Sequence, residues 1–439
     1  MVDKMKVYVH GSYRNIDGQY PVAVSTAVFT HESGSHKAWT RIVPAHPTPT
    51  RQRADLMAIV LALEMAIVDD GRLYDKRAVD LNIYSGSLYA VKSLTDWADR
   101  WIYNGWIGTD GREVDNQDLI KRALQVEEML MDGGSVRYTC IPREEKTEAN
   151  TYGEHALNFA EDQKKYAIKN IFSTEFEYQL DLQAPLRGCP NLRVVIDTVP
   201  EHLLFVYHYC TTHLLKLAEK DSLSDASRKR ILRDTLAGIA NLHERNILHG
   251  DIKPDNIFVN YEESPNGTIE VQRVQVGDLE MGSVIPPGLN VRGAKLGNPM
   301  WRSPESHAAA RINLPTDVFS FGLVCIYTTL RKIIFRIDSE GLSRADEERL
   351  VVKRLLFNFG DGPGLVGLID HLDDSVASWR DLVLDVTPEF TTTNPRKPFS
   401  MWVEINEGFR DIVTKMTSLD PARRITAREA LEHPWFQDL

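Results

Sequence analysis

The chain has 439 residues, a formal net charge of −11 and hydrophobic residues at 43% of its positions. This length suits two domains, each with an apolar core of its own. Neither the first 160 residues nor the remainder carries net positive charge, which disfavours broad nucleic-acid binding because that binding depends on Lys and Arg at phosphates. The four cysteines lie far apart, so we predict neither a disulfide framework nor a zinc site.

No membrane partner is predicted. The first residues are charged, and the longest apolar stretch, residues 56–68, is interrupted by Glu64 and too short to span a bilayer. Together with the dispersed cysteines, this favours a soluble protein of a reducing compartment, cytoplasmic or nuclear.

The first third of the chain mixes strand and helix patterns. Strands are predicted at residues 6–9, 22–29 and 81–85, and a helix begins near Arg53. Short motifs accompany these elements in a fixed order: HGS at 10–12, RADLMA at 53–58, SGSLY at 85–89, NGW at 104–106 and EAN at 148–150. In this order they resemble the ribonuclease H family, over about 150 residues. The resemblance implies a mixed sheet with helices.

The resemblance also implies a nuclease site, in which four carboxylates hold two magnesium ions. At those positions this chain has His10, Asp55, Gly86 and Asn150, so one carboxylate remains. Because Mg²⁺ requires charged oxygen ligands, we predict that this domain is not a nuclease. Glu154 does not replace the acid lost at Gly86. We interpret His10 as a strand-end residue in preference to a new metal ligand.

Three tryptophans, Trp97, Trp101 and Trp106, flank a predicted helix end. Such rings stack on nucleic-acid bases or pack against a core, and we favour packing.

The rest of the chain carries a second series of motifs. A strand is predicted at 166–169, ending in Lys169, followed by a helix at 174–186 and strands at 192–197 and 203–209. A helix capped by Ser224 leads to further motifs: HGDIKPDN at 249–256, DLE at 278–280 after a strand at 269–276, SPE at 303–305, DVFSFG at 317–322, and DPARR at 420–424 before HPWF at 433–436. In this order they resemble the protein kinase family, of the Ser/Thr type.

The kinase resemblance implies a role for each of several residues. Asp251 would orient the attacking hydroxyl and Lys253 would neutralise the transferring phosphate. Asn256 and Asp278 would hold Mg²⁺, with ATP as the phosphoryl donor. Lys169 would contact the nucleotide phosphates and pair with Glu177, or with Glu175 if the register differs.

The chain departs from the kinase pattern at three places. Gly250 replaces the arginine that meets a phosphorylated loop in the family, so activation by loop phosphorylation is not implied. Glu280 replaces a glycine, which removes the freedom to adopt positive φ and adds negative charge near the predicted metal site. Where a glycine-rich phosphate loop is expected, only Gly153 is present. The absence of that loop would weaken the positioning of ATP.

The sequence thus predicts a ribonuclease H-like domain at 1–160 and a bilobal protein kinase-like domain with a truncated small lobe at 161–439, an α/β fold followed by an α+β fold. No Pro, Gly or Ser linker separates them near residues 156–165. Either the first domain stands where the first two small-lobe strands should be, or the chain joins two independent units.

The predicted function is transfer of phosphate from Mg-ATP to a Ser or Thr hydroxyl of a protein substrate, whose identity the sequence does not specify. Two alternatives remain open. One is a pseudokinase scaffold that binds nucleotide or partners without catalysis. The other is a nucleic-acid-binding module built on the ribonuclease H-like domain.

Overall fold

The computed structural model describes residues 3–15, 21–30, 36–69, 79–108, 111–130, 134–145, 147–159, 166–200, 203–337 and 341–437. The chain forms two compact units. The first comprises Met1–Phe176 and Val195–Tyr209, and the second comprises Glu177–Val194 and Cys210–Leu439. The boundary predicted at residue 160 lies outside the described residues. Within them, no helix is both long and apolar enough to cross a membrane.

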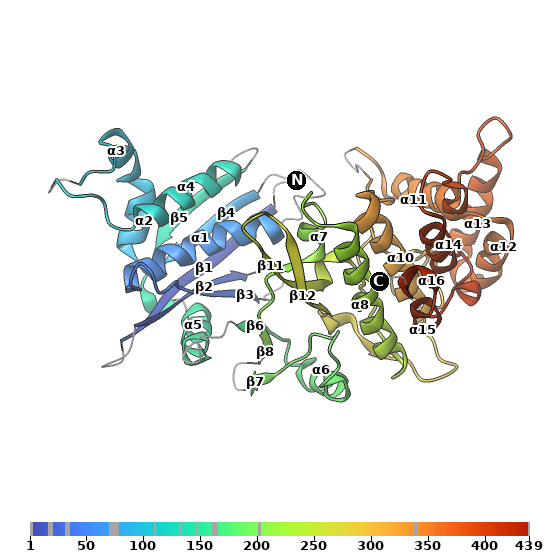
Figure 1. Ribbon diagram of the computed structural model, residues 1–439, viewed down its shortest axis with the longest axis horizontal. Helices are drawn as coiled ribbons and strands as arrows, with labels where there is room; N and C mark the ends of the chain where they lie inside the picture. Colours follow the sequence, from blue (N-terminus) through green and yellow to red (C-terminus); the bar gives the residue numbers. More distant parts are fainter. Residues whose placement is uncertain are drawn as a thin grey trace. The chain divides into compact units, whose positions relative to one another are not determined.

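A five-stranded mixed sheet lies between the helices of the first unit (Figure 1). Its strands are β1 (Asp3–Arg14), β2 (Val22–Thr30), β3 (His36–Ile42), β4 (Val79–Ser85) and β5 (Ser135–Cys140), in the order β3-β2-β1-β4-β5. The first three strands are antiparallel, while β4 is parallel to both β1 and β5. The predicted strands are confirmed, and β3 and β5 are additional.

Helices cover both faces of this sheet. They are α1 (Arg51–Asp69), α2 (Leu88–Thr95), α3 (Ala98–Tyr103), α4 (Gln117–Leu130) and α5 (Thr147–Phe159). Buried side chains of α1 and α4 pack against one face of β1 and β4 in a single apolar core. The other face of β2 and β3 packs against α5.

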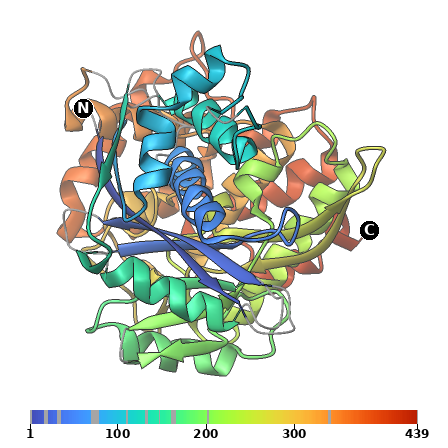
Figure 2. The same cartoon turned by 90° about the vertical axis from the view of Figure 1, so that its left-hand side faces the viewer.

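The second face of the sheet shares its core with a smaller sheet from later in the chain. That smaller sheet has the order β6-β8-β7, with β6 (Tyr166–Asn170), β7 (Asp197–Val199) and β8 (Leu204–His208). Val24 and Val28 of β2 join Ile168 of β6 and Leu204 of β8 in one buried cluster. In Figure 2 the green strands β6, β7 and β8 lie on the same side of the blue strands as helix α5. The first unit therefore combines the ribonuclease H-like sheet with the small-lobe strands.

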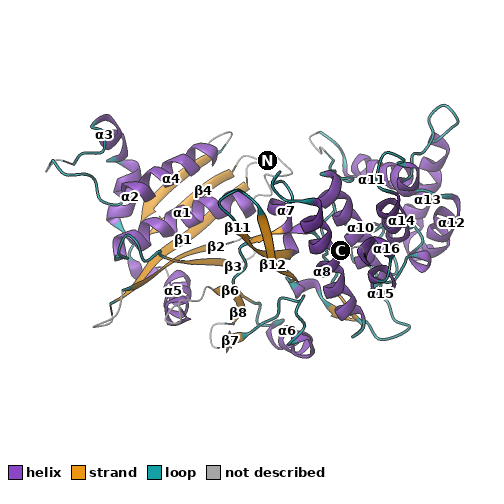
Figure 3. Cartoon of the chain, viewed as in Figure 1, coloured by secondary structure: helices purple, strands orange, loops and turns teal. Residues whose placement is uncertain are grey.

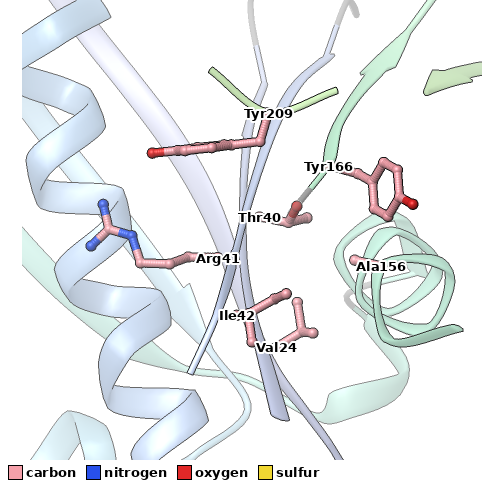
Figure 4. Close-up of a pocket in the computed structure, with 7 residues that line it drawn as sticks. All are labelled: Val24, Thr40, Arg41, Ile42, Ala156, Tyr166 and Tyr209. Carbon is pink, nitrogen blue, oxygen red and sulfur yellow. The ribbon is translucent and has the colours of Figure 1, made fainter. Parts of the chain in front are cut away.

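A small pocket lies where these parts of the first unit meet (Figure 4). Its lining residues come from β2, β3, α5, β6 and the segment after β8: Val24, Thr40, Arg41, Ile42, Ala156, Tyr166 and Tyr209. The charged group among them, Arg41, pairs with Glu64 of α1 at 2.8 Å. Two arginines, Arg41 and Arg122, hold the pKa of Glu64 below its ordinary value although burial acts to raise it.

The second unit is mainly helical (Figure 3). Its helices are α6 (Phe176–Gln183, whose first residue belongs to the first unit), α7 (Leu214–Leu217), α8 (Asp225–His243), α9 (Pro304–His307), α10 (Pro315–Leu330), α11 (Arg344–Phe359), α12 (Gly362–His371), α13 (Ala377–Val386), α14 (Glu407–Met416), α15 (Ala427–Leu431) and α16 (Pro434–Gln437). Its strands are β9 (Thr212–His213), β10 (Ile247–Leu248), β11 (Ile257–Glu263), β12 (Ile269–Val276) and β13 (Ser283–Val284). The predicted cap of α8 is confirmed, since the Ser224 side chain accepts a hydrogen bond from the Ser227 N–H.

The strand predicted at 192–197 is wrong. Leu192 forms only an isolated bridge with Val276, and regular strand structure begins at β7. The backbone N–H of Arg193 bonds to Val276 in the second unit, whereas that of Ile196 bonds to Val206 in the first. Because the chain changes partner between these residues, no continuous ladder forms. The helix predicted at 174–186 is divided into α6 and a 3₁₀ turn at Ala184–Leu186.

Candidate functional site

Asp317, at the start of α10, holds the backbone of the predicted catalytic loop. This carboxylate is fully buried and accepts hydrogen bonds from the backbone N–H of His249, at 2.8 Å, and of Gly250, at 3.0 Å. His243 at the end of α8 lies 3.1 Å from the same carboxylate. Gly250 has φ 76°, a conformation that glycine adopts without strain. The turn at this position therefore accounts for a glycine where the family has an arginine.

His249 ties this loop to the segment that carries Asp278. Its Nδ1 accepts from the Asp251 N–H at 3.2 Å, so its Nε2 carries the proton and donates to the Gly277 carbonyl at 3.1 Å. The Gly277 N–H in turn donates to the Asn256 carbonyl at 3.0 Å. These bonds bring Asp251, Asn256 and Asp278 to one place in the second unit.

Three groups hold the Asp251 carboxylate. Lys253 Nζ donates to Oδ2 at 2.7 Å, and Asn256 Nδ2 donates to the same oxygen at 3.2 Å. The backbone N–H of Asn298 donates to Oδ1 at 2.9 Å. Because Asn256 uses its nitrogen for these bonds and for the Asp251 carbonyl, its side-chain oxygen turns away from Asp251. That oxygen is the atom a hard cation would take as a ligand.

The charge at this site is negative. Burial acts to lower the pKa of Lys253, but Asp251, and beyond it Asp255 and Asp278, raise it above its ordinary value. One ammonium group therefore faces three carboxylates. In the described residues, no three His, Cys, Asp or Glu side chains are close enough to form a metal site alone. Mg²⁺, however, binds through one or two protein ligands together with substrate phosphates, so the donors present fit Mg²⁺ bound with a nucleotide.

The segment Asp278–Glu280 differs from the sequence-based expectation in one respect. The residue with positive φ is Asp278, at 67°, and Glu280 is not among the residues of this kind. Glu280 lies in a 3₁₀ turn at Leu279–Met281 with its side chain exposed. The freedom of a glycine is therefore not required at position 280.

Helix α6 faces this segment with uncharged side chains. Gln179 is buried and donates from Nε2 to the Glu280 carbonyl at 3.2 Å, and the Tyr178 hydroxyl donates to the Gly282 carbonyl at 3.3 Å. Glu177 and Glu175 are both exposed. The sequence prediction did not include Gln179, although it occupies a core position between the buried residues Phe176 and Leu182.

Lys169 lies on β6 of the first unit, where it pairs with Phe205 of β8. Because side chains alternate along a strand, Lys169 lies on the face opposite Ile168, which is in the shared core. Glu177 belongs to the second unit. The pairing of Lys169 with Glu177 or Glu175 stays a prediction.

A buried ion pair joins Glu305 of α9 to Arg424, which lies before α15. Glu305 accepts from Arg424 at 2.5 and 2.7 Å, and the Thr316 hydroxyl donates to Glu305 at 2.6 Å. Both charged side chains are fully buried. Burial acts to raise the pKa of Glu305, yet Arg424 and Thr316 hold it below its ordinary value.

Comparison with known families agrees with this geometry. A family model described as "Protein kinase domain" matches residues 151–436. The chain belongs to the protein kinase family. A second model, described as "RNase H", matches residues 3–138, so the kinase domain follows a ribonuclease H domain in the same chain. Both predicted resemblances are thus confirmed. The kinase match begins within α5, the helix that also covers the ribonuclease H-like sheet.

Similar proteins include one that is a kinase by name. The chain is 26% identical over 257 residues to "Cell division control protein 2 homolog 3" of Trypanosoma brucei brucei, covering 57% of this chain and 74% of the relative. It is 23% identical over 286 residues to "Myosin light chain kinase A" of Dictyostelium discoideum, covering 62% of this chain and 80% of the relative.

Of the four positions that the resemblance assigns to a ribonuclease H metal site, one carries an acid in this chain, Asp55. Asp55 is buried, accepts from the Gly11 N–H at 2.9 Å and pairs with Arg143 at 3.1 Å. Asn150 donates to the Arg143 carbonyl at 2.9 Å. The guanidinium therefore supplies the positive charge beside Asp55. Sequence analysis assigned no role to Arg143, because its contact with Asp55 joins residues 88 positions apart.

The other residues considered in this domain have structural contacts. Glu154 is exposed and lies 3.8 Å from Arg14. His10 is buried beneath α5, where a Cβ on Gly153 would come within 3.0 Å of its ring. Trp101 and Trp106 pack against the core of α1 and α4.

Proposed function

We propose that this chain transfers the γ-phosphoryl group of Mg-ATP to a Ser or Thr hydroxyl of a protein substrate. The observation that carries this proposal is the arrangement of Asp251 with Lys253 and Asn256, in a loop held by the buried Asp317. The fixed carboxylate orients the attacking hydroxyl and accepts its proton as the oxygen bonds to phosphorus and the bond to ADP breaks. The bonds from Lys253, Asn256 and Asn298 restrict the carboxylate to one orientation.

The remaining proposed roles follow from charge. Lys253 neutralises the transferring phosphate, and its neighbouring carboxylates keep it protonated. Asn256 and Asp278 are the proposed Mg²⁺ ligands, and Lys169, with Glu177 as its proposed partner, contacts the nucleotide phosphates. When bound, Mg²⁺ neutralises charge on the phosphate oxygens.

The second candidate is a pseudokinase scaffold, which one observation favours. The only glycine near the expected phosphate loop, Gly153, lies within helix α5, where the backbone N–H groups bond along the helix. Described residues before β6 thus do not supply a glycine loop to cover the phosphates.

Transfer of labelled phosphate from Mg-ATP separates the two candidates. The full chain is assayed on itself and on a generic basic protein, with Asp251→Asn as the test variant and Asp221→Asn, an exposed aspartate paired with Arg331, as the matched control. We expect Asp251→Asn to lose at least about 100-fold in rate, since it removes the proton acceptor. If the folded wild-type chain transfers no more than Asp251→Asn, the kinase proposal fails and the scaffold replaces it.

A further inference from the structure

The segment at residues 295–298 packs directly on the catalytic loop. The Asn298 N–H bonds to Asp251, and Gly297 has φ 79°. A Cβ at position 297 would come within 2.9 Å of the Gly250 carbonyl oxygen, so a larger residue would push the two segments apart. This segment therefore holds one oxygen of the Asp251 carboxylate, while Lys253 and Asn256 hold the other.

One side chain holds three successive carbonyls of this segment. Arg302 donates from Nε to Leu296 at 2.9 Å and from Nη2 to Lys295 at 3.2 Å, and it also donates to the Gly297 carbonyl. The Ser306 hydroxyl adds a bond to Leu296 at 2.7 Å. A planar guanidinium can satisfy several carbonyls at once, which an ammonium cannot match in fixed geometry.

The longer stretch at residues 279–304, which contains this segment, offers no suitable place for an activating phosphate. Its two hydroxyl residues between Asp278 and Glu305 are Ser283 and Ser303. Ser303 is fully buried, contacts Thr316 at 3.0 Å and caps α9. Ser283 lies in β13, paired with Leu248 of β10. The arginine that would receive such a phosphate is Gly250 here.

We propose that Arg302 is a positioning residue that holds residues 295–298 against Asp251, so that this chain needs no phosphate at residues 279–304 for activity. The inference rests on the proposed kinase function. An internal guanidinium bound to backbone carbonyls does what a phosphate bound to basic side chains would otherwise do, which is to order the segment. The field of Asp251 favours the charged guanidinium, although burial lowers the pKa of Arg302.

The test compares Arg302→Met with Arg292→Met in the full chain. Arg292 is a matched control because it lies three residues before this segment, is largely exposed and pairs with Asp373 at 3.2 Å. The first measurement is amide hydrogen exchange at residues 295–298, which does not depend on activity. We expect Arg302→Met to raise exchange at Asn298 at least about tenfold, and Arg292→Met to leave it unchanged. Unchanged exchange in Arg302→Met would overturn the proposal.

The second measurement is phosphate transfer. We expect Arg302→Met to lower kcat about tenfold or more with little change in the KM for ATP, because the Asp251 carboxylate loses its orientation. Treating the wild-type chain with a broad phosphatase should leave its rate unchanged, and a large loss after treatment would also overturn the proposal. If the wild type transfers no phosphate, the proposed function fails, while hydrogen exchange still decides the role of Arg302.

Discussion

Two aspartates with basic neighbours, one in each unit, differ in how much negative charge surrounds them. Asp55 pairs with Arg143 at 3.1 Å, and the other three positions of its former metal site carry no carboxylate. Asp251 pairs with Lys253 at 2.7 Å, but Asp255 and Asp278 also act on that lysine. In the first case charge is balanced within the protein, and in the second an excess of negative charge remains for a cation. We therefore expect the number of carboxylates around the pair, more than the pair itself, to decide whether a site takes Mg²⁺.

The two regions also differ in what their retained residues do. In the second unit, polar residues of the catalytic loop are held by a buried network that includes Asp317. In the first unit, the ribonuclease H-like sheet has two apolar faces, one of which packs on the small-lobe strands. We infer that this sheet contributes to stability by packing on the small-lobe strands, and the first of the following variants tests that inference.

The largest effect is expected from Ile168→Asp. Ile168 is 3% exposed in the cluster that joins β6 to Val28 of β2 and to α5. A carboxylate there would lack a partner, and with the lost apolar contact we expect a cost of at least about 5 kcal/mol, enough to unfold the first unit. Thermal unfolding combined with hydrogen exchange in β2 would measure it.

The matched control is Val366→Asp, because Val366 is 60% exposed on α12. This change should leave both units folded. If Ile168→Asp raised exchange only in β6, β7 and β8 while β2 and α5 kept their protection, the shared core would not couple the two sheets, and the ribonuclease H-like domain would be an independent addition.

A smaller loss is expected from Arg424→Met, which breaks the buried pair with Glu305. Removing one partner leaves a fully buried carboxylate without its guanidinium, so we expect a loss of about 3–5 kcal/mol in unfolding free energy although the Thr316 hydroxyl still donates to it. Denaturant titration at neutral pH would measure it. A loss below about 1 kcal/mol would show that this pair contributes no more than an exposed one.

The pH dependence gives this prediction a second readout. The pKa of Glu305 is lowered in the folded chain, so its contribution to stability is present above the ordinary carboxyl pKa and is lost as the pH falls through the folded value. The wild type should therefore lose its advantage over Arg424→Met below about pH 4. An advantage that stayed constant down to pH 2 would contradict this assignment.

Much of this molecule could be predicted from sequence because its motifs are local. The loop containing Asp251, Lys253 and Asn256 spans a few residues, and its spacing determines which side chains meet. Regular patterns such as β12, at Ile269–Val276, were predicted with correct bounds because strand alternation and turn residues lie within one short stretch.

The contacts that sequence analysis missed join distant segments. Gln179 reaches the Glu280 carbonyl across 101 residues, and no local pattern distinguishes it from an exposed glutamine except its core position on α6. Strand β7 begins later than predicted because the chain passes between the two units at this point. The shared core of β2 and β6 depends on tertiary packing, which one sequence without relatives does not reveal.

The smallest effect is expected from Arg143→Met, which tests the comparison of the two aspartates directly. Asp55 is 3% exposed and would keep its bond from the Gly11 N–H, while the Arg143 side chain is one-third exposed. We therefore expect a loss of about 1–3 kcal/mol in the stability of the first unit, less than for the fully buried Arg424.

Added magnesium makes this a test of function as well as of stability. If Arg143 has taken the place of a cation, millimolar Mg²⁺ should leave the wild-type melting temperature of the first unit unchanged. It should raise that of Arg143→Met by at most about 2 °C, because one carboxylate binds a hard cation weakly. Arg14→Met is the control, since Arg14 pairs at 3.8 Å with the exposed Glu154. A large Mg²⁺-dependent stabilisation of the wild type would contradict this account, because it would require more oxygen ligands around Asp55 than the site provides.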